Sequence, residues 1–459
     1  MPTLPPDPRK AIRDPIYGLI PRTNEEIRLM NTAVFQRLRR IRQLAMAHLV
    51  YPGAVHTRFD HSIGTMHVAG RICTFLQDLQ KITEQETRIV RLAALLHDIG
   101  HGPFSHVSEY LLDHHCKRDV SDDLGTNIHE RLTVQLIQDS PEIGGILSDA
   151  ERQAVVTLLS PSKQRNFKRD IISSSLDADK MDYLLRDSYF AGVKYGTFDL
   201  DKIIDACRVH EAGDESYLAL HYEGVYAFEQ LVMARYHMGQ QVYFHRIRAI
   251  TDALIVRTVN IAIRDKDNDV FSIFQYDGSP DFLERYLKTD DERLLHTLMG
   301  SQNLKVSQLS TRLYQRCLLK QICHLSLIPE EVPNAVTRDK LAKLQPETEG
   351  ARSLEQAIAS KLGIDPDFVI VNTRNAGNPT FRSPSYRLDP EEILILDKDN
   401  TPKKASQFPV CLASTTAEST QSIQVYAPRD AWNDPEAETT QERDELEHTV
   451  RQIIIQHVR

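Results

Sequence analysis

The chain has 459 residues, 41% of them hydrophobic and 26% charged, values typical of a soluble globular protein with a large core and two or three domains. The net charge of −9 argues against non-specific nucleic-acid binding by the whole surface. No apolar run is long enough to span a membrane, and the first residues lack the basic and apolar regions of a signal peptide. We therefore expect a cytoplasmic protein with no membrane segment.

Helical patterns dominate the first 330 residues. Residues 24–48 carry apolar side chains at three- and four-residue steps, which predicts a helix. The clearest helix is predicted over residues 86–98, where an apolar stripe ends just before Gly100. Further helices are predicted over residues 62–80, 130–140, 149–160, 176–190 and 225–262. Strand-like runs are nearly absent here, so we expect an α-helical bundle.

The pattern changes after residue 330, where prolines become frequent. Short β-rich runs occur at residues 368–371, 393–396 and 423–426. An amphipathic helix is predicted over residues 440–457. We therefore expect a mainly α protein in which residues 1–330 form the helical bundle and residues 331–459 form a smaller C-terminal α+β module for assembly or regulation.

The densest group of titratable side chains lies at one predicted helix end: His97, Asp98, His101 and His106. Neighbouring helical residues point about 100° apart, so His97 and Asp98 can share an ion only near the helix end. Other helices must supply the remaining ligands, and His61 and Asp179 lie on separate predicted helices. Two imidazoles and two carboxylates suit Mn, Fe, Mg, Zn or Ni and do not choose among them.

Plainer interpretations of these residues exist. A lone His-Asp pair is common on protein surfaces, and Gly100 and Gly102 can serve only as a helix stop and a turn. The six cysteines are scattered without a CxxC pair, which favours buried free thiols over a disulfide framework or a cysteine-based zinc site. The glycine-rich turn together with the additional histidines favours a functional site.

Several motifs, in this order, resemble the family of SAM-and-HD-domain deoxynucleoside triphosphate triphosphohydrolases and its shorter members without a SAM domain. The matching stretches are Asp14–Gly18, Phe35–Arg39, Tyr51–Ala54, His56–Ser62, Leu95–His106, His129–Glu130 and Asp177–Tyr183. They cover roughly residues 10–262, while the C-terminal third matches more loosely, and no SAM domain is recognisable. The resemblance implies an HD-domain helical bundle that hydrolyses a deoxynucleoside triphosphate (dNTP) to a deoxynucleoside and inorganic triphosphate.

The resemblance also implies roles for individual residues. The metal ligands of the family fall on His61, His97, Asp98 and Asp179. Its catalytic residues fall on His101, His106, Glu109 and His129, with Glu109 in place of a shorter aspartate. Its phosphate contacts fall on Arg58, Lys180 and Arg235, and its sugar contacts on Gln43, Tyr183 and Asp187. Tyr243 would stack near the nucleoside, and the cofactor implied is a divalent metal ion.

Regulation in this family involves tetramers with activating nucleotides bound between subunits, which implies a homotetramer here. Lys10, Gln36 and Arg39 fall where the family contacts an activating guanine nucleotide. Asn31 replaces an aspartate that reads guanine, and an amide offers one acceptor and a donor where a carboxylate accepts two hydrogen bonds. We therefore expect a different activating nucleotide, or none. Alternatively, residues 37–42 form a solvated helix face or ion pairs between subunits.

The individual roles have structural alternatives too. Arg58 can pair with Asp60 or another acid, His106 can cap a helix, and Tyr183 can be a core residue. The same metal site can also serve a phosphohydrolase acting on nucleoside monophosphates, dinucleoside polyphosphates or single-stranded DNA ends. A third hypothesis is a non-catalytic module that binds nucleotides or nucleic acid, which the acidic balance and the intact ligand set disfavour.

Overall fold

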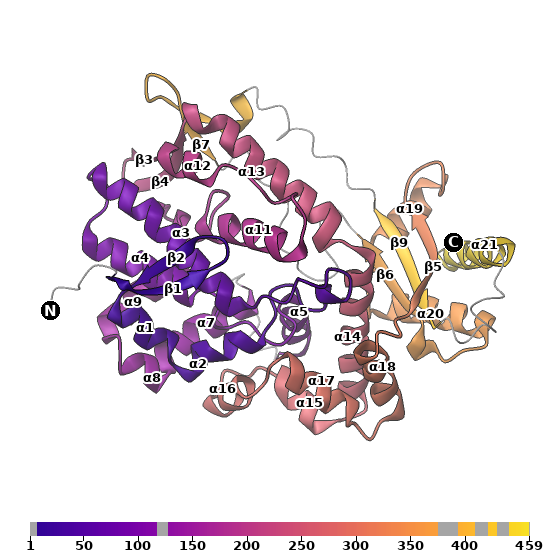
Figure 1. Ribbon diagram of the computed structural model, residues 1–459. Coiled ribbons are helices and arrows are strands. Elements are labelled where there is room, and N and C mark those ends of the chain that lie inside the picture. The colour runs from indigo at the N-terminus through magenta and orange to yellow at the C-terminus, as the bar shows by residue number, and fades with distance from the viewer. Residues whose placement is uncertain (1–6, 117–126, 375–392, 409–420, 429–439, 459) are drawn as a thin grey trace. The chain divides into compact units, whose positions relative to one another are not determined.

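The computed structural model describes residues 7–116, 127–374, 393–408, 421–428 and 440–458, which form two compact units (Figure 1). Unit 1 combines the described parts of residues 1–245, 276–291 and 385–416. Unit 2 combines the described parts of residues 246–275, 292–384 and 417–459. These units do not coincide with a division at residue 330, because strands from the C-terminal third occur in both.

The helices at the centre of unit 1 are α3 (Arg58–Asp78), α4 (Glu84–Leu96), α5 (His106–His115), α7 (Ile128–Asp139), α9 (Asp149–Leu159) and α11 (Ala178–Ala191). α3 packs against both α4 and α11, and α7 packs against α5 and α9. In α3, consecutive residues from His61 to Met66 are buried, so neighbouring elements cover more than one of its faces. The predicted helices in these regions are confirmed within a few residues at each end.

The other described helices of unit 1 are α1 (Asn24–Met30), α2 (Ala33–Gln36), η1 (Arg37–Arg40), η2 (Ala47–Leu49), α8 (Pro141–Gly144), α10 (Phe167–Asp170), α12 (Leu200–Ala206), η3 (Tyr222–Gly224), α13 (Val225–Met238), η4 (Gly239–Tyr243), α16 (Pro280–Leu287) and η6 (Ala405–Gln407). The prediction of one helix over residues 24–48 is wrong. The chain leaves the helix at Asn31, and the Thr32 hydroxyl accepts a hydrogen bond from the Phe35 amide, 3.3 Å away, to begin α2. Such side chains compete with the helical backbone for hydrogen bonds.

Unit 1 also holds two small sheets. β1 (Asp7–Asp14) and β2 (Gly18–Arg22) form an antiparallel hairpin, and β3 (Cys207–Ala212), β4 (Glu215–His221), β7 (Leu394–Leu396) and β8 (Pro402–Lys404) form a sheet in the order β3-β4-β7-β8. Leu220 of β4 pairs with Ile395 of the parallel strand β7. The expectation that strands are nearly absent before residue 330 is wrong. These strands were missed because they are short and partly exposed and carry many polar residues.

Unit 2 contains α14 (Arg246–Arg264), α15 (Asn268–Phe274), α17 (Asp291–Met299), α18 (Leu304–Tyr314), α19 (Ala335–Ala342), α20 (Glu349–Leu362), η5 (Pro366–Phe368) and α21 (Thr440–His457), with the first residue of α17 still in unit 1. Its antiparallel sheet has the order β5-β9-β6, from β5 (Lys320–Ser326), β6 (Ile370–Arg374) and β9 (Ser422–Ala427). Val371 and Val425 of the sheet share a core with Ile358 and Ile454 of the helices. The prediction of a mainly α protein with a smaller α+β part is confirmed.

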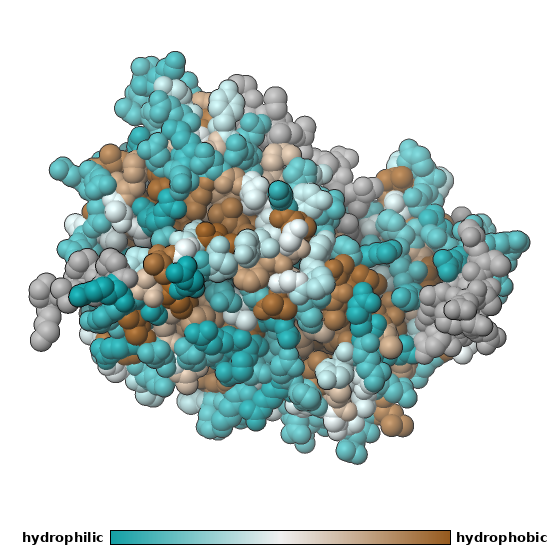
Figure 2. Space-filling view, in the orientation of Figure 1, coloured by the Kyte–Doolittle hydropathy of each residue, from teal (hydrophilic) through white to brown (hydrophobic). Residues whose placement is uncertain are grey.

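The surface in view is mostly hydrophilic, with apolar residues in smaller patches (Figure 2). Among the helices of the described residues, none is both long and apolar enough to cross a bilayer.

Candidate metal centre and active site

The four predicted metal ligands lie at the ends of three helices of unit 1. His61 is in the first turn of α3, His97 is the C-cap of α4 with Asp98 directly after it, and Asp179 is in the first turn of α11. Local capping sets these ends: the Asp60 carboxylate accepts the Thr57 amide at 2.8 Å, which starts α3. The prediction that His97 and Asp98 sit at a helix end is therefore confirmed.

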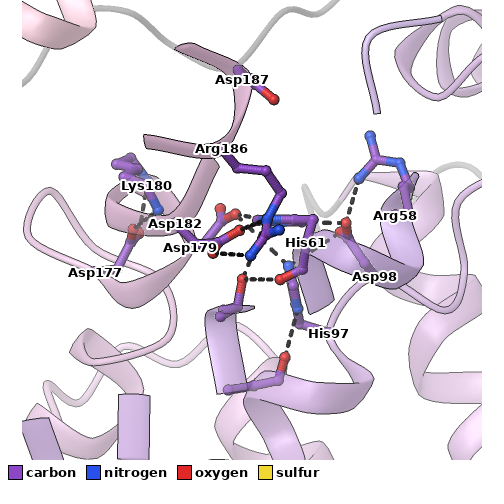
Figure 3. Close-up of polar contacts among 12 residues, drawn as sticks. Arg58, His61, His97, Asp98, Asp177, Asp179, Lys180, Asp182, Arg186 and Asp187 are labelled. Carbon is purple, nitrogen blue, oxygen red and sulfur yellow. Dashed lines mark hydrogen bonds and ion pairs between the residues drawn. The ribbon is translucent and has the colours of Figure 1, made fainter. Parts of the chain in front are cut away.

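Helix packing brings these four side chains into one cluster (Figure 3). His61 Nε2 lies 2.9 Å from Asp179 Oδ1 and 3.7 Å from Asp98 Oδ2. His97 Nε2 lies 3.3 Å from Asp98 Oδ1 and 3.8 Å from Asp179 Oδ1. Donor atoms of His61, His97 and Asp179 all fall within 4.8 Å of one another, so this group could hold a metal ion.

The hydrogen bonds of the two imidazoles fit metal binding. His97 Nδ1 lies 2.8 Å from the Ala94 carbonyl oxygen, an acceptor, so Nδ1 carries the proton and Nε2 presents its lone pair. His97 Nε2 is buried and has no hydrogen-bond partner among the described residues. A buried polar atom without a partner is uncommon and points to a missing ligand. The nitrogen and oxygen donors suit a divalent cation.

A chain of buried charges behind His61 was not identified as part of the site from the sequence. His61 Nδ1 lies 2.8 Å from Asp182 Oδ2, and both Asp182 oxygens accept hydrogen bonds of 2.9 Å from Arg186. Arg186 also donates to Asp14 at 2.8 Å. A carboxylate on the far nitrogen of a ligating histidine sets the orientation and basicity of its ring. The signal in the sequence was the third aspartate of the Asp177–Tyr183 motif.

Electrostatics keeps the cluster carboxylates ionised. Burial would raise the pKa of Asp98, but the positive charge of Arg58 outweighs it and holds that pKa well below its usual range. The effect of burial is likewise outweighed at Asp179, chiefly by its hydrogen bond with His61, and the pKa of Asp179 is lowered well below its usual range. Burial lowers the pKa of His61, yet its hydrogen bonds to Asp179 and Asp182 raise it to about 10. Deprotonated carboxylates are the form that binds cations.

The four predicted catalytic residues form a second cluster. Glu109 lies between two imidazoles, with Oε1 3.1 Å from His129 Nδ1 and Oε2 3.1 Å from His106 Nδ1. The rings of His101 and His129 stack with centroids 4.1 Å apart. His101 Nε2 lies 3.3 Å from Asp98 Oδ1, so the second cluster adjoins the first.

The pKa values of the two stacked histidines are shifted in opposite directions. Burial lowers the pKa of His129, but the Glu109 carboxylate outweighs it and raises that pKa. Burial and then the charge of Arg58 lower the pKa of His101 well below its usual range. One ring of the stack therefore favours the protonated form and the other the neutral form.

Arg58 and Lys180 lie beside the cluster and have acidic partners within the chain. Arg58 Nη1 pairs with Asp98 rather than with Asp60, and its Nε donates to Ser105 Oγ at 2.8 Å. Lys180 Nζ lies 2.7 Å from Asp177 Oδ2. Figure 3 shows Arg58 and Lys180 on opposite sides of the His61 ring. Arg58 Nη2 has no hydrogen-bond partner among the described residues.

Asp187, a predicted sugar contact, lies beside Tyr243, which is predicted to stack near the nucleoside. Tyr243 donates from its hydroxyl to Asp187 Oδ2 at 2.7 Å, and His56 Nε2 lies 2.7 Å from Asp187 Oδ1. The Tyr183 ring lies 6.1 Å from that of Tyr243 and 6.4 Å from that of His61, which links this group to the first cluster. His56 was quoted in a motif but was not assigned a role from the sequence.

The remaining predicted residues differ in burial. Gln43 and Arg235 are 8% and 3% exposed, and Gln43 Oε1 and Arg235 Nε have no hydrogen-bond partner in the described parts of the chain. The predicted regulatory residues Lys10 and Arg39 are exposed. Arg39 Nε donates to Gln36 Oε1 at 3.0 Å, and Lys10 bonds to Asn24.

Two protein-family models match the chain. The HD domain model matches residues 58–187, which contain all four candidate metal ligands. The model of the HD associated region matches residues 198–434, more than half of the chain. The chain belongs to the HD-domain family. The HD resemblance expected from the sequence motifs is thereby confirmed.

Relatives of this HD protein agree with the assignment. It is 34% identical to an uncharacterized protein of Methanocaldococcus jannaschii over 58% of this chain, and 27% identical to the deoxynucleoside triphosphate triphosphohydrolase SAMHD1 of Gallus gallus over 64% of this chain. Each of these two matches covers 53% of the relative's own length, so the chain spans about half of each relative. A phosphohydrolase structure from Bacteroides thetaiotaomicron is 25% identical, with a TM-score of 0.69, covering 92% of this chain and 100% of that one. The chain thus has the fold of an HD phosphohydrolase.

Proposed function

We propose that this HD protein is a metal-dependent enzyme that hydrolyses a dNTP to a deoxynucleoside and inorganic triphosphate. The observation that carries the proposal is the 3.3 Å approach of His101 Nε2 to Asp98 Oδ1, because it joins the His61–His97–Asp98–Asp179 cluster to the His101–Glu109–His129 cluster. Phosphoester hydrolysis needs both a charge-stabilising centre and a proton donor for the leaving oxygen. The name of the Gallus gallus relative supports the substrate class.

In this proposal His61, His97, Asp98 and Asp179 hold one divalent cation, and Mn, Mg, Fe, Zn and Ni all suit the donor set. When bound, the cation would polarise a phosphoryl oxygen and lower the pKa of a water molecule.

Proton transfer falls to the second cluster. The Glu109 carboxylate faces His129 and favours its protonated form, so His129 can donate a proton to the leaving oxygen. His106 is the second partner of Glu109 and holds that carboxylate from the other side. His101, whose pKa is lowered, stays neutral beside it and can accept a hydrogen bond.

Substrate binding is assigned to side chains that have a buried atom without a hydrogen-bond partner among the described residues or that lie in the group around Asp187. Arg58 Nη2, Arg235 Nε and Gln43 Oε1 are buried without a hydrogen-bond partner among the described residues, which supports contact with a polar ligand. Arg58 and Arg235, with Lys180, would bind the phosphates. Gln43, Tyr183 and Asp187 would bind the deoxyribose, and Tyr243 would lie against the nucleoside.

Regulation and setting complete the proposal. We assign Lys10, Gln36 and Arg39 to an activating nucleotide in a homotetramer, and the exposure of Lys10 and Arg39 is consistent with contact to a second subunit. We place the enzyme in the cytoplasm, in keeping with the free thiols of the five described cysteines.

The decisive experiment identifies the product. The purified chain is incubated with Mn²⁺ or Mg²⁺ and each dNTP in turn, with and without added nucleotides, and the phosphate product is separated by ion-exchange chromatography. We expect triphosphate from the wild type, none from Asp179→Ala, and wild-type yield from Asp201→Asn, which alters an exposed aspartate. Pyrophosphate or monophosphate would point to another HD phosphohydrolase, and no product with any activator would refute the proposal.

A further inference from the structure

The turn between His101 and His106 in unit 1 has an unusual backbone. Phe104 and Ser105 are consecutive residues other than glycine, and their φ angles are 58° and 56°. Side chains with a Cβ rarely adopt this region, and such residues persist only where the surroundings hold them. The turn follows His101 and leads directly into His106, the first residue of α5. The positions of both histidines therefore depend on what holds the turn.

One buried carboxylate binds this turn from outside. Asp291 is 1% exposed, and its Oδ1 accepts the Phe104 amide at 2.7 Å. Its Oδ2 accepts a hydrogen bond of 3.0 Å from the amide of Arg42, the residue directly before Gln43. Asp291 thus joins the histidine turn to the segment that carries a proposed sugar contact.

Residues 286–291, which we name the latch, also reach the residues just before this turn, once directly and once through Arg37. The Tyr286 hydroxyl donates to the Gly100 carbonyl oxygen at 2.9 Å. Arg37 donates from Nε to the Thr289 carbonyl oxygen at 2.9 Å and from Nη1 to the His101 carbonyl oxygen at 2.8 Å. The latch lies within the match to the HD associated region and outside the match to the HD domain.

We propose that Asp291 is a positioning residue, through which the HD associated region holds the histidine turn of the HD domain in its reactive geometry. Among the described residues Asp291 makes no hydrogen bond or ion pair with the metal ligands, and it acts through the Phe104 and Arg42 amides. The inference rests on the proposed function in one respect: the effect of Asp291 on turnover is measured with dNTP hydrolysis. The hydrogen bonds to the turn can be tested without any substrate.

Asp291→Asn is the informative variant, because it keeps the shape but turns an NH₂ group toward one of the two amide donors. Asp290→Asn is the matched control: it makes the same change one residue earlier, where the carboxylate accepts from Arg40 Nε at 2.6 Å. Asp291→Glu keeps both acceptor oxygens and tests rescue. All variants are made in the full chain, and hydrogen–deuterium exchange and steady-state kinetics are measured on each.

In Asp291→Asn we expect amide exchange over residues 99–106 to rise roughly tenfold while the rest of unit 1 stays at the wild-type rate. We expect kcat to fall about 10- to 100-fold, with KM within about threefold of wild type, because a small misplacement of reacting groups costs turnover. Asp290→Asn should show neither change, and Asp291→Glu should recover part of the lost turnover.

Unchanged exchange over residues 99–106 in Asp291→Asn would overturn the proposal. Faster exchange throughout unit 1 would also overturn it, since Asp291 would then act on the whole fold. If Asp291→Asn does not fold, the same local readouts are taken from Asp291→Ser, which leaves at most one acceptor oxygen for the two amides, and wild-type values there overturn the proposal. If exchange over residues 99–106 rises in Asp291→Asn but the wild type hydrolyses no dNTP, Asp291 still holds the turn and the proposed function is rejected.

Discussion

The imidazole of His61 is held from both sides, with Nε2 2.9 Å from Asp179 and Nδ1 2.8 Å from Asp182. Motif resemblance identified the first of these aspartates but not the second, because the role of Asp182 depends on the packing of α11 against α3. The buried Arg186 binds both Asp182 oxygens, which keeps that carboxylate ionised and lowers its pKa to about 2 against the effect of burial.

Asp182→Asn should weaken divalent-cation binding. The side-chain amide of this variant would carry no negative charge to orient the His61 ring through Nδ1. Loss of such a carboxylate contact typically lowers metal affinity about 10- to 100-fold. Mn²⁺ affinity, measured by competition with a fluorescent chelator, checks this expectation. Asp201→Asn removes an exposed ion pair with Arg71 and should leave the affinity unchanged. Equal affinities in the two variants would contradict an orienting role for Asp182.

A second titratable group on α3 makes stability depend on pH. His67 packs against the Tyr17 ring with centroids 5.0 Å apart, and burial, together with Arg71 and Arg91, lowers its pKa to about 4. The unfolded chain binds a proton at this residue near pH 6.5, whereas the folded chain does so only near pH 4. Its contribution is therefore complete above about pH 6.5 and is lost as the pH falls toward 4.

We expect the wild type to lose about 2 kcal/mol of unfolding free energy through His67 between pH 7.5 and pH 5. His67→Gln should remove that part of the pH dependence, while His448→Gln, at an exposed position of α21, should retain it. Urea unfolding at the two pH values measures the difference. The same loss in His67→Gln as in wild type would show that other groups cause it.

At the scale of elements, the predicted helices end where local capping stops them. The helix predicted over residues 86–98 is α4, and its end presents His97 and Asp98. The helix predicted over residues 24–48 breaks at Asn31 because the side chains there bond to the backbone. The apolar periodicity predicts the buried faces in both regions, but it does not indicate which polar side chain interrupts a helix.

Close packing of the turn after α4 against α7 gives an element-scale prediction. A Cβ on Gly100 would lie closer than 3.0 Å to the His129 carbonyl oxygen and to the Thr133 amide nitrogen, both of which belong to the α7 backbone. Gly100→Ala should therefore push α7 away, disturb the stack of His101 on His129, and destabilise the fold by about 1–3 kcal/mol.

Gly145→Ala is the matched control, since a Cβ there would meet its nearest atom, the Pro141 carbonyl oxygen, at 3.4 Å. Thermal unfolding and turnover are compared for the two variants. Wild-type turnover and stability in Gly100→Ala would mean that α7 can move without disturbing the histidine stack.

At the scale of the whole molecule, the two compact units each draw strands from the last third of the chain. β7 pairs with β4 in unit 1, whereas β6 and β9 complete the sheet of β5 in unit 2. Truncation after residue 330 would remove partners from both sheets and expose edges and apolar side chains.

We expect the protein truncated after residue 330 to aggregate rather than to form a smaller assembly. A protein truncated after residue 428 keeps every described strand, so it should remain soluble with lower stability. Size-exclusion chromatography with light scattering distinguishes these results. A monodisperse product with wild-type Mn²⁺ affinity after truncation at residue 330 would show that the remaining part folds independently.

Helical content, the principal helices and the HD motifs could be derived from residue order, since short-range periodicity and motif spacing are local properties of the chain. The β-strands before residue 330 and the compact units could not, because pairings such as β4 with β7 join residues that lie far apart in the chain. The same reason applies to the site: motifs named its histidines and aspartates, but Asp182, Arg186, His56 and Asp291 acquired roles only through packing. Contacts between distant segments depend on how whole helices pack, and no local pattern encodes that packing.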